Sequence, residues 1–410
     1  MIEMDIMKKV TTSNIYGFLE AKWGLFYPKF LFSLFRLFPI NRKKVIATAF
    51  KGKKYGDNSQ YIIEKLHDYY SDYDFVWLKE RNAIYDVPKW VRTVDYCMDN
   101  IRTVYEMATA GVWIDTHRLQ MYAKKRKNQL FIETWHGGLG IKKVELDVAA
   151  FLDNYVINHE LEVTNKYADV FISQSDHLSD IYRRAFGYKG PIFKCGYPKN
   201  DLFFKDNGSI KEKVKQALSI KDEKILLYAP SFRDSFYYDV DVSVYDVDFE
   251  RLIETLQRQF GGKWCVMVKW HPLFAKEVEE KMHIPEKVIN ATSYQDVQEL
   301  ILTADIVLSD YSSCIFDAFL RDIPCFTYSK DFDQYKQERG VYYEMDELPF
   351  PYARSNDELM ENIRSFDMKD YLHRVDVFKK RTGLKETGHA SEDIAKRIIG
   401  FINGEEIGWN

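Results

Sequence analysis

The residues of this chain that could do chemistry form a hydroxyl-rich turn and a few motifs built on arginine or histidine. Ser312 and Ser313 follow Asp310 in a short turn, between an apolar run and a helical pattern. The first amides of a helix have no partner within the helix, so such a turn can attract anions. Serine is also an ordinary helix cap, and the turn alone leaves both roles open.

The other motifs carry a guanidinium and two imidazoles. Ser231 and Arg233 follow one apolar run, and His271 follows another. His136 stands before Gly137 at the end of a third run. Glycine lets a ligand approach the backbone closely, so a histidine here can act as a general base. A structural histidine, hydrogen-bonded within a turn, is the alternative for this position.

These motifs share one structural position. Each follows a short apolar run with the pattern of a buried strand, and such runs alternate with helical patterns. This alternation predicts parallel sheets covered on both faces, with ligands beyond the carboxyl ends of the strands. We therefore predict an α/β fold with two Rossmann-like domains facing a cleft. The expected strands are residues 44–50, 75–78, 112–114, 129–134, 169–173, 192–195, 224–228, 264–269, 306–308 and 324–328.

The boundary between the two domains is expected near residue 204. A glycine–proline turn and a polar run at residues 205–209 lie there. The predicted divisions are an amino-terminal segment, a first and a second Rossmann-like domain, and a carboxyl-terminal helix capped by Ser391. Their expected ranges are 1–43, 44–203, 204–390 and 391–410.

The amino-terminal segment contains an aromatic run at residues 23–38, which reads WGLFYPKFLFSLFRLF. This run is too short to cross a bilayer as a helix. Basic residues follow it at Arg42, Lys43, Lys44, Lys51, Lys53 and Lys54. Such a segment suits the interface of an anionic membrane. A buried helix of the first domain, with solvated basic flanks, explains the same pattern equally well.

Composition disfavours several classes of protein. The net charge of −4 over 410 residues argues against a general nucleic-acid binder. Five cysteines without a CxxC pair indicate neither a disulfide framework nor a zinc site, and they fit a reducing cytosol. The chain shows no GxGxxG fingerprint, no P-loop and no signal-peptide pattern.

The motifs of the second domain together suit a diphosphate. Arg233 is expected to bind phosphate oxygens in a bidentate way, and Ser312 and Ser313 to form a neutral cradle. Ser231 is also expected to contact the donor phosphates. Because no P-loop is present, a nucleotide-diphosphate donor is more natural than a triphosphate. The acceptor of the transferred group would then bind on the side of the first domain.

The ordered set of motifs resembles the CDP-glycerol glycerophosphotransferase family of teichoic acid and capsule synthesis. The order and spacing agree over residues 40–390, and each motif is weak alone. Two departures are visible: Gly138-Leu139-Gly140 replaces the usual Thr and Pro, and Phe232 replaces a frequent Trp. The motifs are TWHG at 134–137, GYPKND at 196–201, YAPSFRD at 228–234, HP at 271–272 and SDYSS at 309–313.

The resemblance implies a GT-B fold and a cytoplasmic enzyme bound peripherally to the inner face of the cell membrane. It implies that His136 is the base, and that His271, a second catalytic residue, holds donor phosphates together with Ser312 and Ser313. An acceptor hydroxyl would attack the β-phosphorus of CDP-glycerol or CDP-ribitol, and CMP would leave. The acceptor would be lipid-linked or polymeric.

Further expectations concern the acceptor side and metals. Gly137, Asp57 and Asp201 are expected on the acceptor side, and the two aspartates are the next candidates for the base. No carboxylate cluster marks a metal site, so no tightly bound cofactor is expected, while a loosely bound Mg²⁺ stays open. The alternatives are a GT-B glycosyltransferase or epimerase acting on a UDP-sugar, and a non-catalytic scaffold for capsule assembly.

Overall fold

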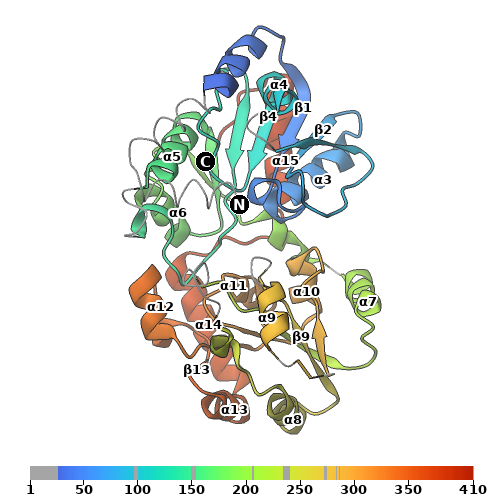
Figure 1. Cartoon of the computed structure of the whole chain (residues 1–410), viewed down its shortest axis with the longest axis vertical. Helices are drawn as coiled ribbons and strands as arrows, with labels where there is room; N and C mark the ends of the chain where they lie inside the picture. The colour runs from blue at the N-terminus through green and yellow to red at the C-terminus, as the bar shows by residue number, and fades with distance from the viewer. Residues whose placement is uncertain are drawn as a thin grey trace.

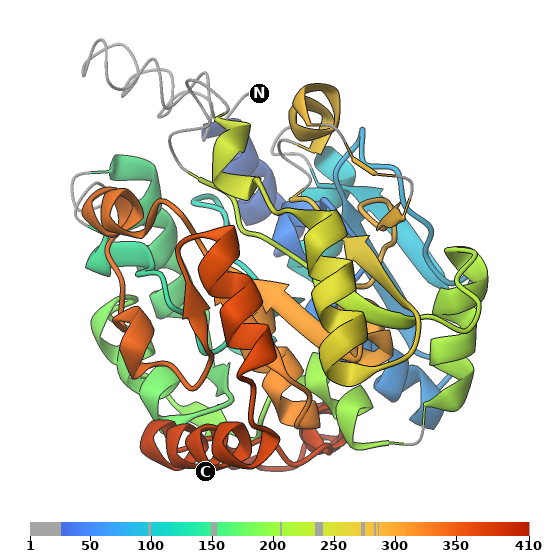
Figure 2. The same cartoon turned by 90° about the horizontal axis from the view of Figure 1, so that it is seen from below.

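The computed structural model describes residues 26–96, 100–148, 154–205, 207–233, 241–271, 275–282, 284–285 and 287–409. Two α/β lobes are stacked along the long axis of the molecule (Figure 1). Helices cover both faces of each sheet, and α8 and α13 lie side by side over the second one (Figures 1 and 2). The predicted arrangement of two Rossmann-like domains is confirmed.

The first domain is built on a parallel sheet with the strand order β3-β2-β1-β4-β5-β6-β7 in the described part of the chain. Its strands point toward the second domain (Figure 1). The strands are β1 (Asn41–Ala47), β2 (Asp74–Lys79), β3 (Val91–Asp95), β4 (Ala110–Asp115), β5 (Leu130–Glu133), β6 (Val170–Ser173) and β7 (Ile192–Lys194). The helices are residues 26–35, α3 (Asp57–Tyr69), α4 (Ile101–Thr109), α5 (Tyr155–Tyr167) and α6 (Asp176–Arg184).

The second domain repeats this plan with the order β10-β9-β8-β11-β12-β13. Its strands are β8 (Lys224–Tyr228), β9 (Trp264–Val268), β10 (Val288–Asn290), β11 (Ile306–Ser309), β12 (Cys325–Tyr328) and β13 (Tyr352–Ala353). Its helices are α7 (Gly208–Ala217), α8 (Phe249–Phe260), α9 (Ala275–Lys281), α10 (Val297–Thr303), α11 (Cys314–Ala318), α12 (Phe332–Arg339), α13 (Asn356–Arg364) and α14 (Met368–Thr382).

The strands form where the sequence is apolar because both faces of each sheet are covered. All residues of β4, β9 and β11 are buried. The expected strands are present with ends shifted by a few residues, whereas the short strands β3, β10 and β13 escaped prediction. Side-chain caps mark helix starts, as where Asp296 accepts a hydrogen bond from the Gln298 amide before α10.

The last helix, α15 (Ala390–Asn403), returns to the first domain. Ile394 and Ile398 are fully buried in the core that also contains Ile62 and Leu66 of α3. The expectation that Ser391 caps this helix is wrong. Asp201 accepts hydrogen bonds from the Ala390 and Ser391 amides at 2.9 and 2.8 Å, so a carboxylate from another segment satisfies the helix start.

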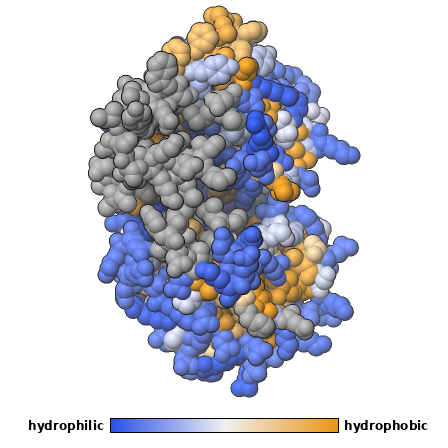
Figure 3. Space-filling model, viewed as in Figure 1, coloured by the Kyte–Doolittle hydropathy of each residue, from blue (hydrophilic) through white to orange (hydrophobic). Residues whose placement is uncertain are grey.

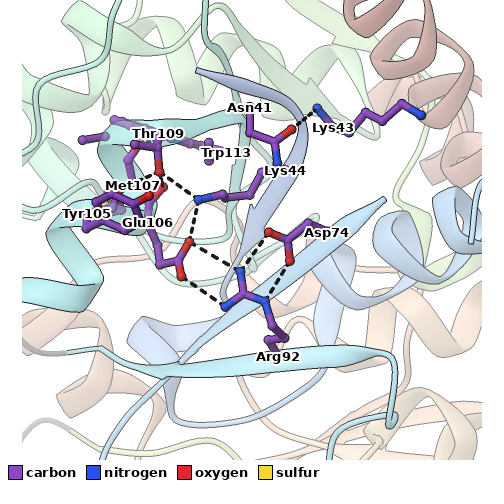
Figure 4. A network of polar contacts seen from close by, with 12 residues as sticks. Asn41, Lys43, Lys44, Asp74, Arg92, Tyr105, Glu106, Met107, Thr109 and Trp113 are labelled. Atoms are coloured by element: carbon purple, nitrogen blue, oxygen red, sulfur yellow. Dashed lines mark hydrogen bonds and ion pairs between the residues drawn. The ribbon is translucent and has the colours of Figure 1, made fainter. Parts of the chain in front are cut away.

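A network of charged side chains, of which Lys44 and Glu106 are buried, joins three strands of the first sheet to α4 (Figure 4). Lys44 of β1 donates to Glu106 of α4 at 2.7 Å, and Arg92 of β3 binds both Glu106 and Asp74 of β2. Lys44 is therefore buried, contrary to the expectation that it flanks a membrane segment. Because ligands of parallel sheets lie beyond the carboxyl ends of the strands, this network serves the fold.

The two domains are tied by an ion pair that is buried on both sides. Lys199 Nζ lies 3.0 Å from Asp317 Oδ2, and their side chains are only 6% and 3% exposed. Gln298 of α10 donates to Asp317 at 3.2 Å and to Asn200 at 2.7 Å. Tyr61 of α3 donates to Asp296 of the second domain at 2.7 Å. These contacts fix the position of one sheet relative to the other.

Lys199→Met is expected to lower the free energy of unfolding by about 3–5 kcal/mol, because it leaves the Asp317 carboxylate buried without its counter-ion. Urea unfolding followed by circular dichroism measures the change. Replacing both partners, Lys199→Met with Asp317→Leu, should recover part of the loss.

The matched control is Lys213→Met. Lys213 pairs with Glu299 at 2.8 Å, but its side chain is 63% exposed. Exposed pairs contribute about 0–1 kcal/mol, so this variant should unfold almost as the wild type does. Equal losses in the two single variants would contradict the role given to the buried pair.

Candidate functional site

The strand orders place a switch point in each domain, where the chain direction across the sheet reverses. The switch points lie between β1 and β4 and between β8 and β11. Ligands of open α/β sheets bind beyond the carboxyl ends of the strands at such points. The loops there are residues 48–56, 115–119, 229–233 and 310–313.

His136 follows β5 in the first domain and has a defined tautomer. Its Nδ1 lies 2.8 Å from the carbonyl oxygen of Thr116. A carbonyl only accepts, so Nδ1 carries the proton and the lone pair is on Nε2. Burial lowers the pKa of His136 to about 3, against a hydrogen bond to Thr116 that raises it. A neutral imidazole with an available Nε2 can accept a proton.

His271 follows β9 in the second domain. Its ring lies beside that of Phe232, with centroids 5.6 Å apart. Burial lowers the pKa of His271 to about 4, and Lys142, Lys53 and Lys54 of the first domain act in the same direction. Lys142 also lowers the pKa of His136. The two histidines thus approach the same cationic region from opposite domains.

Ser312 and Ser313 lie at the start of α11 and are partly exposed. Ser313 is the N-cap residue, but its side chain makes no capping hydrogen bond. Ser312 Oγ accepts a long hydrogen bond, 3.5 Å, from the Cys314 amide. Helix capping therefore explains little of this pair of hydroxyls. Their contact with donor phosphates stays a prediction.

Arg233 has partners that differ from the expected diphosphate. Its Nε and Nη2 donate to Asp331 at 2.6 and 3.1 Å, and its Nη1 donates to Asp310 at 2.6 Å. The guanidinium is buried and lies over the Tyr311 ring, 4.5 Å from its centroid. Nη1 also donates to the Ser231 carbonyl at 2.9 Å, so four of the five N–H groups are used. One remaining donor cannot make a bidentate phosphate contact in this arrangement, so the bidentate expectation is corrected.

Ser231 takes part in the same internal network. Its amide donates to Asp310 at 2.7 Å, and its Oγ accepts from Arg233 at 3.3 Å. The loops after β8 and β11 are thereby cross-linked at the switch point. Ser231 and Arg233 therefore support the loop that carries Ser312 and Ser313. The expected contact of Ser231 with donor phosphates stays a prediction.

The three residues expected on the acceptor side have different surroundings. Asp57 is the first residue of α3 and accepts a hydrogen bond from the Asn58 amide at 2.8 Å. The Gly137 carbonyl accepts from Tyr197 at 2.9 Å, next to His136. Asp201 is buried and engaged with the start of α15, so the expectation that it is an alternative base is corrected.

The loops of the first domain contain strained backbone. Phe50, Lys51, Asp57, Trp135 and Glu145 have positive φ values between 49° and 59°. Such conformations cost about 1–3 kcal/mol each and gather at functional sites. All five lie in or after loops that follow β1 and β5. This backbone strain marks the site, but it could not be predicted from the sequence.

Sequence reasoning did not assign His117 or Lys142 to the site, and it placed Lys53 beside the expected membrane segment. His117 follows β4 and stacks on His136, with centroids 5.5 Å apart and planes at 18°. The signal for His117 was available, since it comes directly after a strand expected at residues 112–114. Pro272 and Asp234, which belong to the quoted motifs, lie outside the described residues.

In the described part of the chain, no group of three or more His, Cys, Asp or Glu side chains could hold a metal ion. The expectations about Mg²⁺ and cofactors stay predictions. No described helix has the length and apolar character needed to cross a bilayer.

Comparison with known proteins identifies the family. The model of "CDP-Glycerol:Poly(glycerophosphate) glycerophosphotransferase" matches residues 30–400. The chain is 27% identical to the teichoic acid poly(glycerol phosphate) polymerase of Bacillus subtilis strain 168 over 384 residues, which is 90% of this chain and 50% of that protein. The polymerase of Bacillus spizizenii W23 is also 27% identical, with 90% of this chain and 95% of that protein covered.

The fold is similar to that of a solved structure of the wall teichoic acid polymerase TagF, a histidine variant soaked with CDPG. The TM-score is 0.78 at 25% identity, covering 92% of this chain and 94% of that one. The chain spans about half the length of the polymerase of Bacillus subtilis strain 168. The GT-B-like fold expected from the sequence is confirmed, and so is the phosphotransferase family. The chain belongs to the CDP-glycerol:poly(glycerophosphate) glycerophosphotransferase family.

Proposed function

We propose that this protein transfers glycerol phosphate, or a related alditol phosphate, from its CDP derivative to a polymeric or lipid-linked acceptor, with release of CMP. The observation that carries the proposal is the pairing of a base-competent His136 with a cationic region shared by His271. Family membership and the likeness to a TagF variant soaked with CDPG support the choice of donor.

In the proposed reaction, an acceptor hydroxyl gives its proton to Nε2 of His136 and attacks the β-phosphorus of the donor. The bond from that phosphorus to the bridging oxygen breaks, and CMP leaves. Phosphoryl transfer depends mainly on positioning and on charge stabilisation. The lysines Lys53, Lys54 and Lys142, together with His271, would balance the charge of the diphosphate, while Ser312 and Ser313 would donate to its oxygens.

His136→Ala is expected to lower the turnover number for CMP release from CDP-glycerol by roughly 10²–10⁴-fold, because the general base is lost. Equilibrium binding of CMP should stay near the wild-type value. The measurement is CMP release with a glycerol phosphate acceptor, beside UDP release from UDP-sugars. Faster UDP release by the wild type would overturn the proposed function.

His67→Ala is the control for loss of an imidazole. His67 stacks on Trp90 with ring centroids 4.0 Å apart, on α3 and outside the site. This variant should retain wild-type turnover. If His136→Ala also retained it at saturating donor, His136 would not be the base, and Asp57 would be tested next.

The rate of CMP release should stay level from about pH 8 down to about pH 5.5. The base must be neutral, and burial lowers the pKa of His136 to about 3, so the imidazole stays neutral throughout this interval. An ordinary histidine, with a pKa of about 6.5, would lose most of its neutral form over the same interval. A fall in the rate centred near pH 6.5, with unchanged circular dichroism, would contradict the assignment.

We further propose that residues 26–38 dock on an anionic membrane surface. Phe32 is buried against Trp113 and Tyr122, as expected for a helix of the first domain. The other face exposes Phe26 to 67%, Phe30 to 56% and Leu37 to 80%. Figure 3 shows apolar residues gathered at this end of the molecule. A buried helix of the first domain, the alternative interpretation of this run, therefore accounts for one face of the helix only. Residues 23–25 of the run lie outside the described residues.

The triple variant Phe26→Ser, Phe30→Ser, Leu37→Ser should bind vesicles containing phosphatidylglycerol at least about 100-fold more weakly. Burying each of these side chains is worth about 1.5–3 kcal/mol. Co-sedimentation measures the bound fraction, and high salt should release only part of the wild type, because part of the contact is apolar.

The control replaces exposed apolar residues elsewhere, Ile84→Ser with Val377→Ser, which are 100% and 52% exposed. This control should sediment with vesicles as the wild type does. Equal sedimentation of the triple variant would end the membrane proposal.

A further inference from the structure

His117 has a tautomer opposite to that of its neighbour His136. The backbone amide of Arg118 donates to Nδ1 of His117 at 2.9 Å. A neutral His117 must therefore carry its proton on Nε2, which makes Nε2 a hydrogen-bond donor. Nε2 has no hydrogen-bond partner among the described residues. Two stacked imidazoles thus present one acceptor nitrogen, on His136, and one donor nitrogen, on His117.

Hydrogen bonds to residues on both sides of His117 hold the loop that carries this donor. The His117 amide donates to Asp115 at 3.0 Å, the Leu119 amide to Thr164 at 2.8 Å, and Thr116 Oγ1 accepts from the Phe50 amide at 3.1 Å. A site built from such fixed donors needs little rearrangement when a ligand binds.

Arg118 adds further support to the same loop. Its guanidinium binds Glu145 at 2.6 Å and Glu160 at 3.1 Å, and these side chains are largely buried. The amide that sets the tautomer of His117 belongs to this anchored residue. The imidazole therefore has a fixed donor atom and a fixed position beside His136.

The location of His117 indicates which reactant it meets. It follows β4 at the switch point of the first domain, and it is partly exposed. Lys53 lowers the pKa of both His117 and His271, so His117 lies on the side of the first domain that faces the second. Burial keeps His117 neutral at physiological pH, because it lowers the pKa of the imidazole well below its usual value.

We infer that His117 is a positioning residue that donates a hydrogen bond from Nε2 to an oxygen of the acceptor chain end, beside the hydroxyl that His136 deprotonates. The inference rests on the proposed transfer reaction. It assigns to His117 the recognition of a polyol phosphate acceptor. His271, Ser312 and Ser313 of the second domain are assigned to the donor phosphates, with Lys53, Lys54 and Lys142 of the first domain balancing their charge. His117 instead stands beside the base, so it contributes to acceptor affinity and leaves donor affinity unchanged.

His117→Leu should raise the KM for a soluble glycerol phosphate oligomer by about tenfold, since one hydrogen bond is lost. CMP affinity and the slow release of CMP from CDP-glycerol into water should not change. His117→Gln, whose amide nitrogen can replace Nε2, should recover most of the loss, and His67→Leu should behave as the wild type.

Three results would overturn the inference. They are an unchanged acceptor KM in His117→Leu, no recovery in His117→Gln, and an equal loss of transfer and of release into water, which would place His117 on the donor or in the fold. Circular dichroism of each variant confirms that it is folded.

A binding measurement separates this inference from the proposed function. The measurement is NMR of wild-type protein labelled with ¹⁵N-histidine. The Nδ1 of His117 should be unprotonated. Adding the glycerol phosphate oligomer, without donor, should shift the Nε2 resonance of His117. The absence of such a shift would overturn the inference. If the His117 resonance shifts but the wild-type protein releases no CMP from CDP-glycerol, only the proposed function is contradicted.

Discussion

The buried ion pair between Lys199 and Asp317 is the contact on which the geometry of the site depends. Asp317 lies in α11, four residues after Ser313, and Lys199 belongs to the segment that leaves the first domain. The Lys199 amide donates to Asn58 at 3.2 Å, and Asn58 donates to the Trp135 carbonyl at 3.1 Å, directly before His136. These polar contacts join α11, the helix that follows the serine turn of one domain, to Trp135, the residue before the histidine of the other. Because such a pair is costly when broken, it holds the domains in one arrangement.

The loop after His136 extends this coupling. Leu139 and Ile141 are fully buried in the core of the second domain, although they follow a strand of the first. The Tyr342 amide donates to the Ile141 carbonyl at 2.7 Å, so backbone pairing supports the apolar contact. The departure from the family pattern at Gly138-Leu139-Gly140 therefore falls in a segment that docks on the other domain. Any movement of one domain against the other would displace the loop next to the base.

Charges are used differently at the two edges of the first sheet. At the amino-terminal edge, Lys44 and Glu106 are paired and buried, which joins strands to α4. At the carboxyl edge, strained loops and lysines surround imidazoles that burial keeps neutral. The first arrangement satisfies each charge internally. The second leaves cationic groups beside neutral imidazoles, which suits an anionic substrate and a base that must accept a proton.

The sequence alone determined the fold class, the positions of most strands along the chain, the family and the placement of His136, His271 and the serine turn at strand ends. These features follow from local periodicity and from motifs that are contiguous in the chain. Only the tertiary structure decided which polar groups satisfy one another. Arg233 faces Asp310 and Asp331, which are distant in sequence, and Asp201 meets α15 across 189 residues. The tautomers of His117 and His136 also depend on contacts with backbone groups, one of them 20 residues away. Residue types and spacing carry no record of such pairings, because packing between separate elements selects them.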